Sequence, residues 1–426
     1  MRSRDAAGGS DLVGRSLAQP LPGATWRARV RDASEIAAQL NLLWQTYTAA
    51  QGGGPSPNGA GPDEVDEAHM VTARAATLNL TAAARSRSEA ARIRAAIASL
   101  SDLYPSRATV LIADPTHVDD GGPGIDVQVE LLEQGAGRGR SAVVFECVTV
   151  NVSMANERQL ASIAAPLLVP DLPDFLWWAA DGADGGALLS ELVSFSDRLI
   201  LDSAVSLHPA GVLRALLAFT HDPADQAALS DFAWARLAPW RRLTTQFFDV
   251  PAALPILDLI DEATLTYGNS PHQWSGFSGA LLYAGWLGSR LNWRTPGELL
   301  PVRGEPNVWR ATLRAGAAGQ QREVSLTLRP TARPLAASTL LDVRLAADGG
   351  KAGYFIVERL DQDEVSTTSA SPEMPGMVRT VYAPVPDDAD LLGEELRIFG
   401  RDPIFEAALA FAADLAPEGF RGVIPR

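Results

Sequence analysis

The feature that most constrains the fold is an alternation of short apolar runs with helical segments, which begins near residue 72. The apolar runs at 107–113 and 142–152 predict strands, and the segment 88–100 between such runs has isoleucines on one helical face. Strands that alternate with helices favour an α/β sheet covered on both faces. The runs at 125–132 and 142–152 follow one another as a hairpin, so we expect the sheet to be mixed.

The chain on either side of this region has a different character. Residues 1–24 are polar and glycine-rich, which predicts a disordered tail, and 32–50 have the spacing of an amphipathic helix. The Gly- and Pro-rich segment 51–62 predicts a flexible linker. Short strands with turn signals between them follow Trp293, and the polar segment 366–375 predicts a loop.

We therefore predict three parts. Residues 1–62 form the tail, helix and linker, and residues 63–295 form an α/β domain whose mixed sheet has helices on both faces. Residues 296–426 form a smaller, mainly antiparallel α+β domain.

The composition argues against a nucleic-acid partner, a membrane-spanning helix and secretion. The formal net charge of −15 opposes a phosphate backbone, so we expect no nucleic-acid partner. No run reaches the ~18 uninterrupted apolar residues of a membrane helix, and the first residues lack the apolar region of a signal peptide. These features predict a cytoplasmic protein. The single cysteine, Cys147, lies in an apolar run, which predicts a buried, inert thiol.

The sequence lacks the usual catalytic patterns. No two of the five histidines have the i, i+4 spacing of a helical metal site. The glycines at 135, 137 and 139 lead into a strand, whereas a dinucleotide loop leads into a helix, so they predict a hairpin turn. Residues 276–280 have alanine where an esterase elbow has its last glycine. We therefore expect no catalytic residue, cofactor or metal, which favours a binding or regulatory protein.

Two adjacent tryptophans, Trp177 and Trp178, form the first unusual stretch. Prolines at 170 and 173 precede them and predict a rigid, extended entry into a strand. Successive side chains of a strand point to opposite faces, so each face of the sheet receives one indole. A core position for both is the default, and contact with a partner is the alternative for one of them.

The second stretch, 196–203, ends in Asp202 and Ser203. These two residues are expected at the carboxyl end of a short strand, where parallel sheets form ligand crevices. Helix capping by either residue is the alternative interpretation.

The third stretch, 230–248, predicts a helix that is kinked or restarted at Pro239. Trp234 and Arg241 share its polar face and are of the residue types enriched in binding hot spots, so they predict an interdomain or an intermolecular contact. Arg236 falls on the apolar face, where it would require a partner such as a carboxylate.

These stretches resemble the glucose-6-phosphate dehydrogenase assembly protein (OpcA) family. The family pattern contains Pro-Leu-Leu-Val-Pro-Asp-Leu-Pro, Asp-Arg-Leu-Ile, Trp-x-Arg-Leu-x-Pro-Trp-Arg and Gly-Trp-Leu-x-Ser-Arg-Leu. This chain has them in order at 166–173, 197–200, 234–241 and 285–291. Tyr104 stands where the family usually has His, and the single Cys147 departs from the thiol-based redox control proposed for photosynthetic members.

The resemblance implies a non-enzymatic, cytoplasmic partner of glucose-6-phosphate dehydrogenase that acts as an assembly factor or allosteric activator. Such a protein supports the oxidative pentose phosphate pathway and NADPH supply. The candidate partner-binding residues are Trp177, Trp178, Trp234 and Arg241. The alternative is a sugar-phosphate-binding protein or enzyme that uses the crevice near Asp202 and Ser203, and a third option is a module that senses a metabolite.

Overall fold

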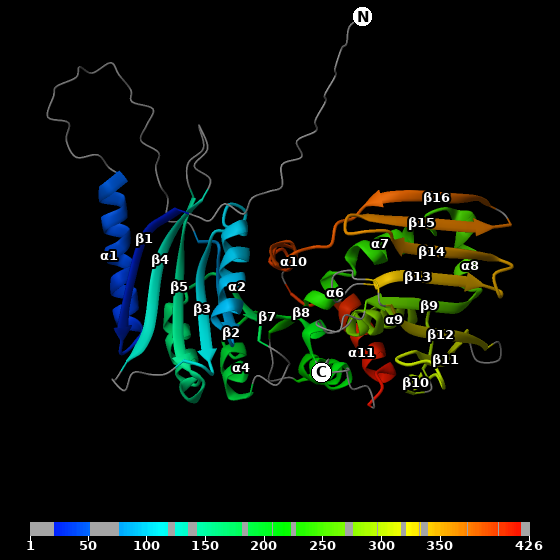
Figure 1. Cartoon of the computed structure of the whole chain (residues 1–426), viewed down its shortest axis with the longest axis horizontal. Coiled ribbons are helices and arrows are strands. Elements are labelled where there is room, and N and C mark those ends of the chain that lie inside the picture. The colour runs from blue at the N-terminus through cyan, green and yellow to red at the C-terminus, as the bar shows by residue number, and fades with distance from the viewer. Residues whose placement is uncertain are drawn as a thin grey trace, which may run out of the picture.

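The computed structural model describes residues 21–51, 76–117, 124–134, 143–180, 186–206, 208–222, 227–268, 276–295, 297–316, 321–331, 333, 340–372, 374–398 and 400–418. Within them, two eight-stranded sheets lie side by side, each with helices packed against it (Figure 1). The mixed α/β fold with a mainly antiparallel C-terminal sheet is confirmed. The predicted tail at 1–20, linker at 52–62 and glycine turn at 135–139 lie outside the described residues. None of the described helices has the length and apolar character of a membrane span.

The first sheet is built around a set of parallel strands. It contains β1 (Leu21–Val30), β2 (Leu78–Ala84), β3 (Ser106–Asp114), β4 (Ile125–Gln134), β5 (Val143–Ser153), β6 (Asp174–Trp178), β7 (Arg198–Leu201) and β8 (Ala228–Asp231). Their spatial order is β1-β4-β5-β3-β2-β6-β7-β8, and β4 pairs antiparallel with both β1 and β5. From β5 to β8 all pairs are parallel, in the chain order 3-2-1-4-5-6 of doubly wound dinucleotide-binding folds.

Strand β1 differs from the sequence prediction, which assigns residues 1–24 to a tail. It pairs with β4 along its whole length and so extends the first sheet. Helix α1 (Ala33–Gln51) follows it and buries Ile36 and Leu40 in the core of this sheet. Strand β1 contains Arg27 and Arg29, so it lacks the continuous apolar run by which buried strands are predicted.

Helices cover the two faces of the first sheet unequally. One face carries α1, α3 (Gln159–Ala164), α4 (Gly186–Val193) and α5 (Pro209–His221), which share a core with Trp178. On the other face, α2 (Arg87–Leu100) packs Ile93 and Ile97 near Trp177. In Figure 1, α2 lies over β2 and β3, and no helix lies over β4 or β5 in this view.

The second sheet begins earlier in the chain than the predicted boundary at residue 296. It contains β9 (Ile260–Gly268), β10 (Leu300–Pro301), β11 (Trp309–Ala315), β12 (Arg322–Thr331), β13 (Leu340–Ala347), β14 (Gly353–Arg359), β15 (Glu364–Ser371) and β16 (Met374–Tyr382). Strand β9 lies between β12 and β13, parallel to β12 and antiparallel to β13. The predicted domain boundary between residues 295 and 296 would therefore assign β9 to the first domain, whereas β9 belongs to the second sheet.

The segment 366–375 forms parts of β15 and β16, so its prediction as a loop is wrong. The two strands pair with each other at the edge of the sheet. Their outward side chains face solvent, so serine and threonine replace the apolar residues that would have signalled strands. Hydroxyl-bearing β-branched residues such as Thr367 and Thr368 remain favourable in such strands.

Two helices join the sheets. Helix α9 (Phe277–Arg290) is buried from Phe277 to Gly288, and α11 (Pro403–Leu415) packs against both α9 and α5. A Cβ on Gly285 would overlap the carbonyl oxygen of Ala408, so glycine is required for this close approach. Helix α10 (Asp388–Glu395) returns to the first sheet, where Leu391 and Leu392 join the core beneath α2.

Replacement of Gly285 by alanine should destabilise the protein because the added methyl group overlaps the α11 backbone. We expect the free energy of unfolding to fall by about 1–3 kcal/mol in chemical denaturation, the usual cost of overpacking. Gly211 in α5 is the matched control, because a Cβ there would meet only the Cβ of His208, at 3.8 Å. Gly211→Ala should be neutral or up to ~1 kcal/mol more stable, and equal losses for both variants would contradict the packing argument.

Candidate functional site

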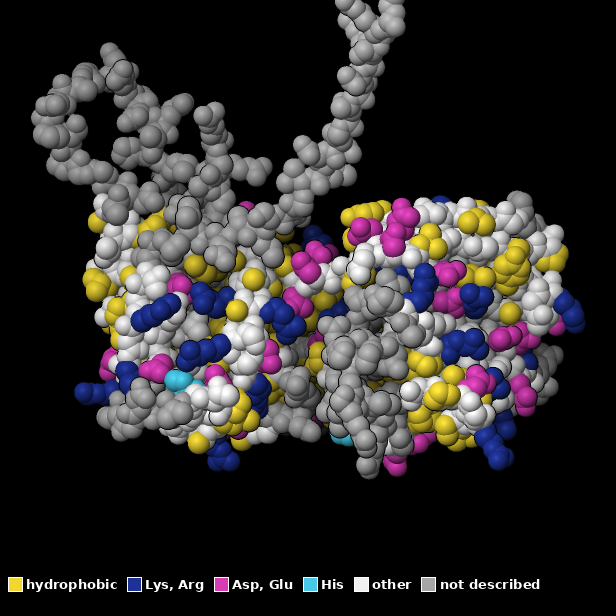
Figure 2. Space-filling model, viewed as in Figure 1, with side chains coloured by type: hydrophobic (Ala, Val, Ile, Leu, Met, Phe, Trp, Pro, Cys, Tyr) yellow, Lys and Arg dark blue, Asp and Glu magenta, His cyan; other side chains and the backbone are white. Residues whose placement is uncertain are grey.

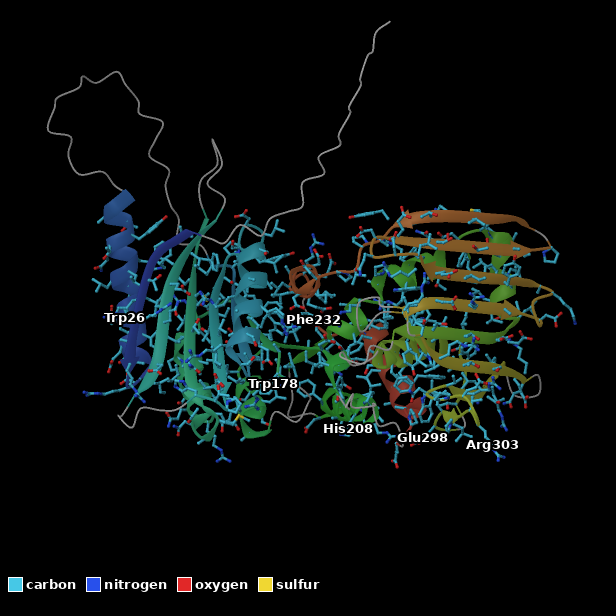
Figure 3. The ribbon with its side chains drawn as sticks, in the orientation of Figure 1. Trp26, Trp178, His208, Phe232, Glu298 and Arg303 are labelled. Carbon is cyan, nitrogen blue, oxygen red and sulfur yellow. The ribbon has the colours of Figure 1, made fainter. Side chains whose placement is uncertain are left out.

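Strand β6 places the two adjacent tryptophans on opposite faces of the first sheet. Trp177 is 2% exposed, and its ring centroid lies 5.6 Å from that of Phe232. Trp178 is also 2% exposed, and the Arg85 guanidinium lies 5.5 Å from its ring centroid. In Figure 3, the label of Trp178 lies on the part of the molecule that contains the first sheet, and the label of Phe232 lies between the two sheets. Neither indole offers surface to a partner in this conformation, so the core position is the one that the structure supports.

Asp202 and Ser203 follow β7 and are engaged inside the protein. Asp202 caps the short helix η3 (Ser203–Val205) by accepting a hydrogen bond from the N–H of Ala204, at 3.1 Å. Its carboxylate also accepts two hydrogen bonds from Arg236, at 2.8 and 2.7 Å. The prediction that Arg236 requires a carboxylate is confirmed. Ser203 is 1% exposed, so the predicted crevice is not open at these residues.

A second buried carboxyl, Asp231, connects the ends of β7 and β8. Its Oδ1 accepts hydrogen bonds from the N–H groups of Ser203 and Ala233, both at 2.9 Å. Asp231 is fully buried, and this burial, with the nearby charge of Asp202, raises its pKa to about 7. The carboxyl thereby fixes the start of helix α6 (Phe232–Ala235) against the end of β7.

Trp234 lies in the core and not on the polar face that the sequence predicts. The expected helix is divided into α6 and α7 (Ala238–Gln246), so the helical phase changes between them. Trp234 packs on Phe405 of α11 with ring centroids 5.5 Å apart, and its Nε1 donates to Asp402 Oδ2 at 3.2 Å. The guanidinium of Arg241 stacks 3.5 Å from the Trp234 ring centroid. The structure thus shows an interdomain contact.

Trp234 and Arg241 also line a pocket, here called the junction pocket, between α6, α7, α10 and the start of α11. Its volume is about 470 Å³. Arg198 donates to Ser230 Oγ at 2.5 Å, and Ser230 Oγ donates to Glu395 Oε2 at 2.5 Å, along one wall. Burial lowers the pKa of Arg241 to about 10. The pocket therefore combines a desolvated cation, an aromatic face and a buried carboxyl.

The sequence does not reveal the Arg198, Ser230 and Glu395 wall. Ser230 and Glu395 are 165 residues apart, and no local pattern connects them. Arg198 falls within the unusual stretch 196–203, but its role becomes visible only with its partners.

The point where the strand order reverses, between β2 and β6, carries charged side chains in place of glycines. In doubly wound folds a dinucleotide binds there, with glycines in the turn and the pyrophosphate at the helix N-terminus. Here the turn has Arg85 and Ser86, and the Glu89 carboxylate accepts a hydrogen bond from the Arg85 N–H at 2.7 Å. The Arg85 guanidinium pairs with Glu157 at 2.5 Å. These residues do not fit a pyrophosphate, because Glu89 occupies the helix N-terminus with negative charge.

Cys147 is 1% exposed on β5, and burial raises the pKa of its thiol to about 11. This agrees with the prediction of an inert thiol. Within the described residues, no group of three or more His, Cys, Asp or Glu side chains could hold a metal ion.

Two family models match the chain in order and together cover well over half of it. Both describe parts of a glucose-6-phosphate dehydrogenase subunit. Residues 97–218 match the model of its N-terminal domain. Residues 227–409 match the model of its C-terminal domain.

Three curated relatives carry the name OxPP cycle protein OpcA. The relative from Synechocystis sp. is 25% identical over 294 residues, which are 63% of this chain and 55% of the relative. The relative from Nostoc punctiforme is 27% identical over 283 residues, or 64% and 57% of the two chains. That from Synechococcus elongatus is 28% identical over 280 residues, or 64% and 60%. The chain thus spans little more than half the length of these relatives.

Two solved structures are similar at low identity. Glucose-6-phosphate 1-dehydrogenase from Mycobacterium avium is 12% identical with a TM-score of 0.49, over 80% of this chain and 91% of that one. The myo-inositol dehydrogenase from Lactobacillus casei is 10% identical with a TM-score of 0.41, over 80% and 93%.

Stability should depend on pH through Asp231. Its pKa is raised from an ordinary 3.8 to about 7 in the folded protein, so between these values the unfolded chain loses a proton that the folded protein keeps. The free energy of unfolding contributed by Asp231 therefore falls as pH rises from about 4 to about 7 and is constant above. We expect Asp231→Asn, which keeps an acceptor for the two N–H groups, to gain stability relative to the native protein across this window.

Urea unfolding of both proteins at pH 5, 6, 7 and 8 measures this difference. Asp258→Asn, at an exposed carboxyl, is the control and should follow the native profile. A constant difference between Asp231→Asn and the native protein at all four pH values would contradict the assignment.

Proposed function

We propose that this chain, which belongs to the OpcA glucose-6-phosphate dehydrogenase assembly family, binds glucose-6-phosphate dehydrogenase and promotes its assembly or activity. In this proposal the protein is an assembly factor or allosteric activator and not an enzyme. It would act in the cytoplasm, where it would direct carbon into the oxidative pentose phosphate pathway and so support the supply of NADPH.

The observation that carries the proposal is the pair of family matches. Both are described as domains of a glucose-6-phosphate dehydrogenase subunit, and they follow one another at 97–218 and 227–409. The names of the curated relatives, which refer to the OxPP cycle, agree with it. The negative charge of Glu89 in the first turn of α2, where a doubly wound fold binds a pyrophosphate, supports a binding protein over a dehydrogenase.

Activation follows if the chain binds one state of the dehydrogenase more tightly than the other. A partner that prefers the active conformation or oligomer shifts the population towards it by its difference in affinity. A tenfold change in the ratio of the active to the inactive state requires a difference in binding free energy of only about 1.4 kcal/mol. No chemistry on the substrate is needed for this effect.

The junction pocket is the surface that we assign to the dehydrogenase. Arg241 is held flat on Trp234 at 3.5 Å, and a cation in this position is preorganised for a carboxylate or carbonyl of the partner. Exposed Arg242 and Ile398 lie on the rim of the same pocket. Trp177 and Trp178 would act indirectly, because their packing in the core fixes β6. Strand β6 pairs with β7, and Arg198 of β7 lines the pocket.

The alternative function, a sugar-phosphate protein or enzyme at the Asp202 and Ser203 crevice, draws little support from the geometry. Asp202 is paired with Arg236, and Ser203 is buried. A thermal-shift screen of the isolated chain with glucose 6-phosphate, 6-phosphogluconate and NADP distinguishes it. A shift that is lost in Asp202→Asn would favour this alternative.

Arg241→Gln should weaken binding to the dehydrogenase. It removes the cation of the junction pocket but keeps a side chain that can lie on Trp234. Because arginines in desolvated pockets are typical hot spots, we expect the dissociation constant to rise about tenfold or more, measured by calorimetric titration with the dehydrogenase of the same organism. Circular dichroism checks that the variant is folded.

Arg303→Gln is the matched control, since Arg303 is exposed near β10 (Figure 3). It should bind as the native protein does. An unchanged affinity for folded Arg241→Gln would remove the pocket from the interface. The absence of any binding or activation by the native chain would refute the proposed function itself.

A further inference from the structure

A groove on the first sheet is separate from the junction pocket. It lies on the α2 face, and its residues come from β1, β4, β5, β3 and the first half of α2. Its volume of about 540 Å³ is in the range of small-molecule sites. Here it is called the α2 groove.

The groove exists because a helix of the doubly wound pattern is replaced by a strand. In that pattern a helix connects the second and third parallel strands and covers one face of the sheet. Here the connection from β3 to β5 runs through β4, which lies in the sheet as an antiparallel strand. Among the described residues, no helix therefore covers the face next to α2 above β4 and β5.

Three arginines lie around this groove. Arg94 on α2 forms an ion pair with Glu130, whereas Arg87, in the first turn of α2, is exposed and 3.9 Å from Asp114. Arg27 on β1 is exposed, and among the described residues we find no ion pair for it. Figure 2 shows basic side chains gathered on this face of the first unit. In a chain with a net charge of −15, this local excess of cations favours an anion.

The floor of the groove is polar and incompletely bonded. The sheet register aligns Arg27 with Gln128 and Gln128 with Thr149, so these side chains form one row across three strands. The hydroxyl of Thr149 and Oδ1 of Asn151 are buried without a hydrogen-bond partner. Both residues line the groove, and buried polar groups are normally bonded, so a rotation of these side chains towards the groove would let the hydroxyl groups of a ligand satisfy them.

One acidic residue shares the groove. Asp126 on β4 lies next to Asn151 in the register, and its Oδ2 is 3.2 Å from Nε2 of His117. Its carboxylate is therefore directed to His117, which is not among the residues that line the groove.

We propose that the α2 groove binds a small phosphorylated polyhydroxy compound, a sugar phosphate. Arg27 and Arg87 hold the phosphate, because guanidinium groups form paired, charge-assisted hydrogen bonds with phosphate oxygens. Thr149, Asn151 and Gln128 bind the hydroxyl groups. This inference does not rest on the proposed function, since it concerns the isolated chain and another face of the molecule.

Calorimetric titration of the full chain tests the proposal with three probes: glucose 6-phosphate, inorganic phosphate and glucose. We expect glucose 6-phosphate to bind most tightly, inorganic phosphate more weakly and glucose not measurably. Fructose 6-phosphate and 6-phosphogluconate extend the series of sugar phosphates. The affinity should fall as salt increases, because the contacts to phosphate are electrostatic.

Arg27→Gln should raise the dissociation constant for glucose 6-phosphate about tenfold, and the double variant with Arg87→Gln should raise it further. Thr149→Val should weaken the binding of glucose 6-phosphate and leave the affinity for inorganic phosphate unchanged. Thr149→Ser, which keeps the hydroxyl group, should bind glucose 6-phosphate as the native protein does. Arg303→Gln should have no effect, and circular dichroism confirms folding of each variant.

Three results would overturn the proposal. One is the absence of binding for every sugar phosphate in the series. Another is binding that is unaffected by Arg27→Gln and the double variant, and the third is equal affinity for glucose and glucose 6-phosphate. Since no dehydrogenase is present in these titrations, their failure leaves the proposed partnership untouched.

Discussion

The burial of helix α9 is the constraint on which the rest of the structure depends. Its side chains are enclosed from Phe277 to Gly288. Two glycines on this helix, Gly285 and Gly288, let α11 approach so closely that any side chain would collide with it. Since α11 also packs on α5, the two sheets are held as one body. The junction pocket lies at this seam, between α6, α7, α10 and the start of α11.

Much of the fold could be predicted from the sequence, because buried strands and amphipathic helices leave periodic apolar patterns. The pairing of Arg236 with a carboxylate followed from the same logic, since a charge on an apolar face must be compensated. Strands β1 and β15 leave no such pattern, because one face of each is solvated and their polar residues resemble those of a tail and a loop. Trp234 lies in the core and not on the polar face because a break of two residues between α6 and α7 changes the helical phase.

The candidate site was only partly predictable. Trp234 and Arg241 share a sequence motif and lie together in the structure, 3.5 Å apart. Glu395 reaches the same pocket from a helix far along the chain, and no spacing rule connects it with Ser230. The α2 groove has the same origin, since its row of polar residues is assembled by strand register across β1, β4 and β5. Sites made by tertiary contacts leave no local signal.

The return of α10 to the first sheet limits when the core of that sheet can close as the chain is made. Leu391 and Leu392 complete a core whose other members lie between residues 78 and 232, apart from Leu396 beside them. On the ribosome, that core remains open until residues 391–396 have been made, and the strands of the second sheet are synthesised before the first sheet is closed. The first sheet therefore reaches its final packing only after the second one has been synthesised.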